Sequence, residues 1–180
     1  MNLQILTGVG EKKTTRRNAL RLGAASIGFG LLTKKGLLPE AQAAGTDVLL
    51  LSCMDFRLMD DVQKYMAGRG MVDKYDHVVL AGASLGATTD KYPAWNTTFW
   101  DHLDIAIKLH NIHTVLVMDH RDCGAYKVIL GPDHAKEGKL ERDTHATHLK
   151  NLKTAILKKY PKLKVETALM SLDGKVETIA

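Results

Sequence analysis

The chain has 180 residues, a length that favours a single domain. Its excess of 25 basic over 20 acidic side chains lies entirely in residues 1–43, which hold seven basic and two acidic groups. The remaining 137 residues carry 18 of each sign (25 − 7 and 20 − 2), so the larger part of the chain is neutral. This part of the chain lacks the excess of basic residues that is typical of nucleic-acid binding, so we predict no nucleic-acid partner.

Residues 1–43 have the composition of an export signal. The pair Arg16–Arg17 precedes a modestly apolar stretch at 22–32, and Ala41-Gln42-Ala43 provides a small-residue cleavage site. We predict a twin-arginine signal and a periplasmic or otherwise exported protein. An uncleaved anchor and a cytosolic amphipathic helix are the alternatives. The apolar stretch is too short for a typical membrane span, and no later segment is longer, so we expect no stable span after signal removal.

Strand-like and helix-like patterns alternate through residues 44–180. Short apolar runs indicate buried strands, and apolar residues at helical spacing indicate helices that Pro161 and several glycines end. The predicted strands are 47–52, 77–81, 113–119, 165–172 and an edge strand at 175–179, and the predicted helices are 58–67, 95–110, 124–130 and 144–160. This order predicts an α/β fold in which helices flank a sheet with a parallel core.

Reactive side chains follow two of these strands. Cys53, Asp55 and Arg57 come directly after the first strand, and His120 and Cys123 follow the third. Parallel α/β sheets bind their ligands at the carboxyl ends of the strands. If the two strands are neighbours, two thiolates and one imidazole meet at one point, and this set binds catalytic zinc with a fourth position open.

Cys-x-Asp-x-Arg after one strand, followed by His-x-x-Cys-Gly after a later one, resembles the β-class carbonic anhydrases. The resemblance covers most of residues 46–180. It implies a β-carbonic anhydrase-like domain over 44–180, with Zn²⁺ held by Cys53, His120 and Cys123. It also implies a homodimer or higher homo-oligomer, because the family's site lies at a subunit interface.

The resemblance further implies the reaction, which interconverts carbon dioxide and bicarbonate. Zinc lowers the pKa of a bound water, and the resulting hydroxide attacks the small electrophilic carbon. Asp55, oriented by Arg57, accepts the hydroxide's hydrogen bond; in some family members this aspartate instead becomes the fourth zinc ligand. Two thiolates leave the water less acidic than three imidazoles would, so activity is expected to rise towards alkaline pH.

Several alternatives stay open at this point. The family usually carries Arg-Asn-Ala-Gly after its second strand, and the corresponding stretch here, Val79-Leu80-Ala81-Gly82-Ala83-Ser84, keeps the small residues but lacks the Arg and Asn. This departure favours a non-catalytic zinc-binding subunit of a periplasmic assembly. Another alternative is a zinc hydrolase of carbonyl sulfide or carbon disulfide. A third is a metal-free domain with a Cys53–Cys123 disulfide, since exported proteins favour disulfides.

The remaining candidates have ordinary structural interpretations. Arg57 and Asp55 also fit a plain structural ion pair. His145 and His148, three residues apart, fit a metal site or a proton shuttle, but we expect a solvated helix face. We expect Asp122 to support the site or face solvent, without a part in the metal set. Trp95 is expected in the core or at a dimer contact.

Overall fold

The computed structural model describes residues 46–179. The predicted export signal at 1–43 lies outside this range. No helix within 46–179 combines the length and the apolar character needed to cross a membrane.

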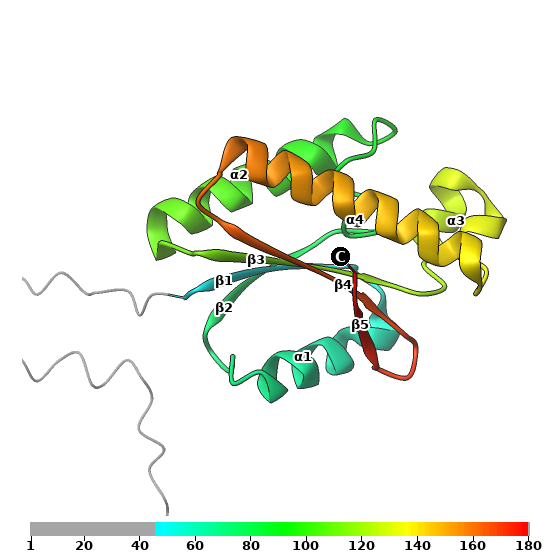
Figure 1. Ribbon diagram of the computed structural model, residues 1–180, viewed down its shortest axis with the longest axis horizontal. Helices are drawn as coiled ribbons and strands as arrows, with labels where there is room; N and C mark the ends of the chain where they lie inside the picture. The colour runs from blue at the N-terminus through cyan, green and yellow to red at the C-terminus, as the bar shows by residue number, and fades with distance from the viewer. Residues whose placement is uncertain (1–45, 180) are drawn as a thin grey trace, which may run out of the picture. The chain divides into compact units, whose positions relative to one another are not determined.

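A five-stranded sheet forms the centre of the domain, in the order β2-β1-β3-β4-β5 (Figure 1). The first four strands run parallel and β5 runs antiparallel to β4. The strands are β1 (Val48–Ser52), β2 (Tyr75–Val79), β3 (Thr114–His120), β4 (Lys164–Met170) and β5 (Val176–Thr178). The predicted α/β class with a parallel core is therefore confirmed.

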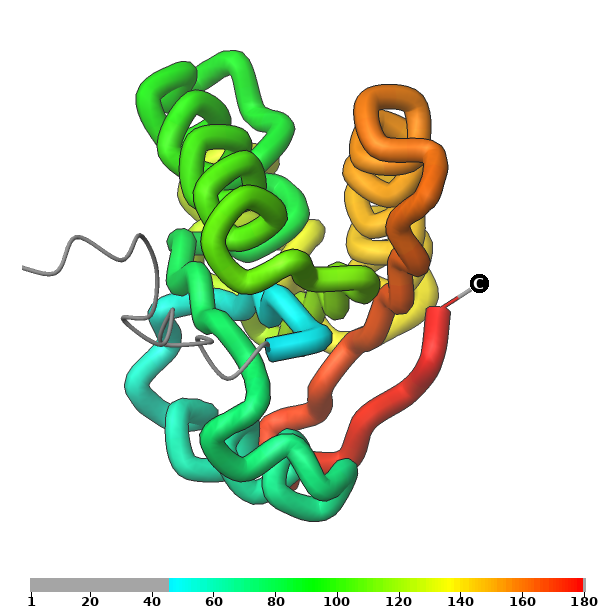
Figure 2. Tube along the Cα trace, turned by 90° about the vertical axis from the view of Figure 1, so that its left-hand side faces the viewer, coloured from blue at the N-terminus to red at the C-terminus, as the bar shows by residue number. Residues whose placement is uncertain are grey.

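Helices cover both faces of the sheet. Figure 2 shows α1 on one side and the pair α2 and α4 together on the other. The helices are the 3₁₀ helix Phe56–Leu58, α1 (Met59–Gly68), α2 (Pro93–His110), α3 (Gly124–Leu130), the 3₁₀ helix Pro132–Ala135 and α4 (Lys139–Lys159). Each parallel crossover passes through one of these layers, as parallel pairing requires.

The central strands are buried on both faces, which explains their nearly continuous apolar sequence. In β1, Leu49 and Leu51 pack towards α2 and α4, whereas Leu50 packs towards α1. This period of two places adjacent side chains in different layers. Phe99 of α2 and Met66 of α1, both fully buried, fill the two layers.

Several element boundaries differ from the predictions, among them the starts of β2 and α4. β2 begins at Tyr75 rather than at residue 77, because an edge strand accepts the half-exposed Tyr75 and Asp76 beside Val48 and Leu49 of β1. The helix predicted at 144–160 begins at Lys139. Its charged first turn looks like a loop in the sequence, but Glu141 within it is completely buried against the β3–α3 connection.

Candidate metal centre

The sheet brings the predicted ligands together at the carboxyl ends of β1 and β3. These strands pair directly, with Ser52 opposite Met118, so the residues that follow them share one sheet edge. Cys53 follows β1, His120 ends β3, and Cys123 is the N-cap of α3. One ligand atom from each lies within 4.8 Å of the others, and the two sulfurs are 3.9 Å apart.

The donor set fits a zinc ion. His120 is 3% exposed, and its Nδ1 lies 2.8 Å from the backbone oxygen of Arg121, so that nitrogen carries the proton. Its Nε2 is buried and has no hydrogen-bond partner within residues 46–179. A lone pair held towards two sulfurs, with the other ring nitrogen fixed by a carbonyl, is the arrangement that metal-binding histidines adopt.

The two cysteine thiols differ in how readily they ionise. Their mutual hydrogen bond lowers the pKa of Cys53, against the opposing effect of burial, and the Gly82 N–H donates to the same sulfur at 3.2 Å. The pKa of Cys123 is raised, because its thiol hydrogen-bonds to Cys53 in the protonated form, and burial and the negative charge of Cys53 add to this effect. Both cysteines are free, in contrast to the disulfide alternative. A divalent cation would offset the second charge and release the remaining proton.

Asp55 lies beside the cluster and forms a bidentate ion pair with Arg57. Arg57 Nε donates to Asp55 Oδ1 at 2.9 Å, and Nη2 donates to Oδ2 at 2.8 Å. These hydrogen bonds hold the pKa of Asp55 at about 2, so the carboxylate is ionised at neutral pH. Asp55 Oδ2 is 3.8 Å from His120 Nε2, which places a negatively charged acceptor next to the ligand set.

A second acidic residue anchors the same guanidinium. Arg57 Nη1 donates to Asp122 Oδ2 at 2.8 Å, and Nη2 donates to the Asp122 backbone oxygen at 3.0 Å. Asp122 has a φ of 52°, and its N–H donates to the buried carboxylate of Glu141 at 2.6 Å. Asp122 thus stands outside the ligand cluster but fixes Arg57, and Glu141 fixes Asp122; the sequence offered no signal for Glu141.

An apolar pocket opens beside the cluster. It has a volume of about 370 Å³, and Cys53 and Asp55 are among the residues that line it. Its walls come from the β1–α1 connection, the β2–α2 connection, the start of α2, and α3: Met54, Phe56, Ala81, Tyr92, Trp95, Gly124, Ala125, Val128 and Ile129. Small apolar molecules can therefore approach the ligand cluster. Trp95 lines this pocket, stacked on Tyr92 at 4.2 Å between ring centroids.

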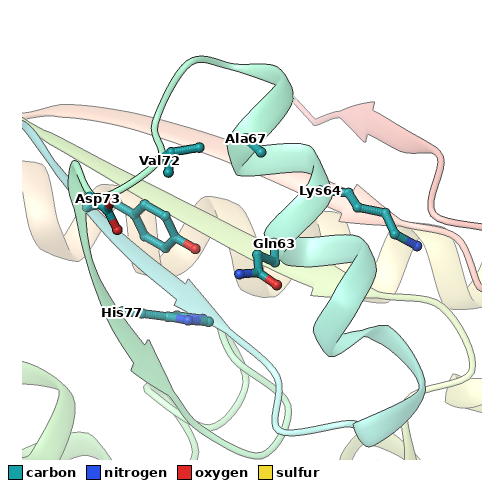
Figure 3. Close-up of a pocket in the computed structure, with 7 residues that line it drawn as sticks. Gln63, Lys64, Ala67, Val72, Asp73 and His77 are labelled. Atoms are coloured by element: carbon teal, nitrogen blue, oxygen red, sulfur yellow. The ribbon is translucent and has the colours of Figure 1, made fainter.

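A second pocket of about 480 Å³ lies between α1 and β2 (Figure 3). His77 extends from β2 towards the helix, whereas Lys64 points away from the pocket. None of the clustered ligands or the Asp55–Arg57 pair lines it. We therefore place the candidate site at the apolar pocket and not here.

The expected solvated helix face at His145 and His148 is wrong for His145. This side chain is 0% exposed, and its Nδ1 lies 3.0 Å from Asp119 Oδ2. His148 is partly buried and meets the Tyr126 ring edge-on. The polar spacing suggested solvent, but α4 turns this face towards the end of β3. A signal was present in Asp119, a charged residue that follows four apolar residues in a predicted buried strand.

Comparison with known proteins places this chain in a family. A family model described as "Putative carbonic anhydrase" matches residues 43–180. An uncharacterized protein of Rickettsia conorii is 45% identical over 131 residues, covering 73% of this chain and 70% of that protein. A second, from Rickettsia bellii, is 42% identical over 131 residues, covering 73% and 80%.

Solved structures agree on the fold. The β-carbonic anhydrase CafD of Aspergillus fumigatus matches with a TM-score of 0.50 and 12% identity, covering 80% of this chain and 95% of that one. A mutant of CafD matches with a TM-score of 0.50 and 14% identity, covering 80% of this chain and 94% of that one. The family match and the sheet architecture together show that the chain belongs to this carbonic anhydrase family and has a β-carbonic anhydrase fold.

Proposed function

We propose that this protein is a zinc-dependent lyase that reversibly hydrates carbon dioxide to bicarbonate. One observation carries the proposal: the Cys53–His120–Cys123 cluster lies beside the Asp55 carboxylate, and Cys53 and Asp55 both line an apolar pocket. Zinc, when bound by these three residues, supplies Lewis acidity that makes water nucleophilic near neutral pH.

Asp55 orients the reacting water in this proposal. Its carboxylate stays ionised because Arg57 holds its pKa at about 2, so it acts as a hydrogen-bond acceptor across the working pH range. Both carboxylate oxygens are paired with Arg57, which keeps Asp55 in one position. A fixed acceptor aims a lone pair of the water at the carbon and lowers the cost of orienting it.

The pocket selects the substrate by size and polarity. Its walls are mainly apolar side chains, among them Met54, Phe56 and Val128. Carbon dioxide is small and has no net charge, so it enters such a pocket without losing strong hydrogen bonds to water. Bicarbonate is charged and is better solvated outside, which favours its release after hydration.

Carbonyl sulfide and carbon disulfide are the second candidate substrates. Both are linear, uncharged and apolar, so the same pocket admits them. The loss of the family's Arg-Asn pair near Leu80-Ala81 is the sequence feature in which this chain departs from the β-carbonic anhydrases that it resembles.

Assays of three substrates on one sample of purified protein distinguish the two candidate functions. The zinc-loaded protein is assayed side by side with carbon dioxide, carbonyl sulfide and carbon disulfide, after its zinc content is measured. Turnover highest with carbon dioxide supports the proposal, and turnover only with a sulfur compound supports the second candidate. Stoichiometric zinc without turnover of any of the three would instead indicate a non-catalytic zinc-binding subunit.

We also propose that the protein forms a homodimer or a higher homo-oligomer. The rim of the pocket exposes large apolar side chains: Phe56 is 87% exposed, Val128 65% and Met54 63%. Such a contiguous apolar rim is costly in water and is typical of an interface. A second copy of the chain covering it would shield the pocket from solvent.

A further inference from the structure

A buried carboxylate lies next to the metal cluster without touching its ligand atoms. Asp119, 1% exposed, accepts hydrogen bonds at Oδ1 from Ser84 N–H at 2.9 Å and at Oδ2 from Ser84 Oγ at 2.6 Å. Tyr126 Oη donates to Oδ2 at 2.7 Å, and His145 Nδ1 lies 3.0 Å from it. Ser84, Tyr126 and His145 are each 0% exposed, so none of these hydrogen bonds is weakened by solvent.

One segment that hydrogen-bonds to Asp119, the loop after β2, also carries a hydrogen-bond donor to the metal cluster. Ser84 belongs to the loop after β2, and two residues earlier the Gly82 N–H donates to Cys53 Sγ at 3.2 Å. The loop reaches this position through Gly82 and Ala83, whose φ angles of 75° and 37° lie in the left-handed region. For alanine this backbone costs energy, so the loop needs an anchor such as the two hydrogen bonds of Ser84.

Two of the other segments joined to Asp119, β3 and α3, lie directly beside metal ligands. Asp119 immediately precedes His120 in β3, and Tyr126 lies one turn after Cys123 in α3. His145 ties α4 to the same carboxylate, and its ring packs against that of Tyr126 at 3.8 Å between centroids. A single side chain therefore joins the loop of Gly82, the end of β3, α3 and α4.

We propose that Asp119 is a positioning residue that presets the spacing of Cys53, His120 and Cys123 and thereby slows the loss of zinc. This inference rests on the proposed metal centre and extends it to residues that touch no ligand atom. Binding zinc ionises two sulfurs that lie 3.9 Å apart. Holding them in place before the metal arrives lowers the cost of assembling the site, and residues that orient ligands from outside commonly control metal affinity.

Two variants each remove a single hydroxyl from the carboxylate. Tyr126→Phe deletes the Tyr126 donor, and Ser84→Ala deletes one of the two Ser84 donors while its N–H stays. Thr167→Val is the matched control, because it also removes a buried hydroxyl, one that donates to the Ile179 backbone oxygen in the sheet away from the ligands. Replacement of Asp119 itself is avoided, since it leaves several buried donors unpaired and endangers folding.

The experiment measures zinc transfer from the loaded full-length protein to a coloured chelator, together with the thermal midpoint of each metal-free variant. We expect Tyr126→Phe and Ser84→Ala to release zinc about 10- to 100-fold faster than the wild type, the range for residues that orient ligands. Thr167→Val should release zinc at the wild-type rate despite a similar fall in thermal midpoint. The cobalt-loaded Tyr126→Phe and Ser84→Ala proteins should also show altered thiolate-to-metal absorption, which the control should not.

Two results together would overturn the inference. Ser84→Ala and Tyr126→Phe would release zinc at the same rate as Thr167→Val when their thermal midpoints are equal, and their cobalt spectra would match that of the wild type. If Tyr126→Phe does not fold, Ser84→Ala decides alone. A wild-type protein that takes up no zinc would overturn both the metal centre and this inference. A zinc-loaded protein that hydrates no carbon dioxide would refute the proposed reaction but leave this test intact.

Discussion

Arg57 illustrates how much of the site depends on single residues. The motif Cys53-x-Asp55-x-Arg57 is readable in the sequence, and the structure places all three residues at one sheet edge. Asp122 holds Arg57 from the other side and is itself held by Glu141. The sequence did not predict these contacts. Their roles arise from the left-handed turn at Asp122 and from the burial of Glu141, both set by tertiary packing.

Replacing Arg57 with lysine should separate positioning from charge. Lysine keeps the positive charge but lacks the planar fork that reaches both oxygens of Asp55 and the backbone of Asp122. We expect the zinc-loaded Arg57→Lys protein to lose about 100-fold in carbon dioxide hydration rate, at the lower end of the range for positioned proton-handling groups. Stopped-flow rates and zinc content are measured together.

Arg69→Lys is the matched control for that experiment. Arg69 also pairs with a carboxylate, Glu166, but through one nitrogen and away from the cluster. It should retain the wild-type rate. A wild-type rate in Arg57→Lys would contradict the positioning role of the guanidinium.

At the scale of elements, the apolar runs predicted β1, β3 and α3 to within one residue. These segments are buried on all sides or end at glycine, so their own sequence determines them. β2 and α4 were less predictable, because an edge strand and a charged helix start depend on partners elsewhere in the chain. The site depends on β1 and β3 being neighbours in the sheet. The α/β pattern of the sequence did not establish this pairing, so it entered the prediction of the site only as a condition.

The Arg69–Glu166 pair links the end of α1 to β4 and makes stability depend on pH. Burial raises the pKa of Glu166, but hydrogen bonds from Lys164 and Arg69 outweigh it and lower the pKa below its ordinary value of 4.5. A carboxyl with a lowered folded-state pKa stabilises the fold above its unfolded-state pKa and loses this effect as pH falls through the folded-state value.

Glu166→Gln should therefore cost about 0.5–1 kcal/mol of unfolding free energy at pH 7, the scale of a partly exposed ion pair. The difference from wild type should be smaller at an acidic pH below 4.5, because the Glu166 carboxyl loses its charge as the pH falls through its lowered folded-state pKa. Denaturant unfolding at the two pH values measures it. An equal difference at both pH values would show that the charge of Glu166 is not the cause.

At the scale of the whole molecule, the exposed apolar rim of the pocket is the basis of the proposed assembly. Phe56→Glu places a charge on the most exposed apolar side chain of this rim and should convert the proposed oligomer into monomers, since an aromatic hot-spot residue at an interface often contributes about 2 kcal/mol or more. Leu109→Glu is the control, because Leu109 is 65% exposed on α2 outside the pocket. Sedimentation velocity distinguishes the species, and a wild-type monomer would refute the assembly.

Export is proposed from residues 1–43, which lie outside the described structure. Changing Arg16 and Arg17 together to lysine should retain the precursor in the cytoplasm, because the twin-arginine pathway reads the paired guanidinium groups. Changing Lys12 and Lys13 to arginine should leave export unchanged. Cell fractionation followed by immunoblotting measures both, and periplasmic protein from the double lysine variant would exclude this route.

The most direct test of the account is stopped-flow carbon dioxide hydration by the zinc-loaded protein across pH, with Asp55→Ala alongside. We expect a rate well above buffer that rises towards alkaline pH and falls about 100-fold or more in Asp55→Ala, whose zinc content stays at wild-type level. No rate above buffer at any pH, with zinc confirmed in the protein, would contradict the account.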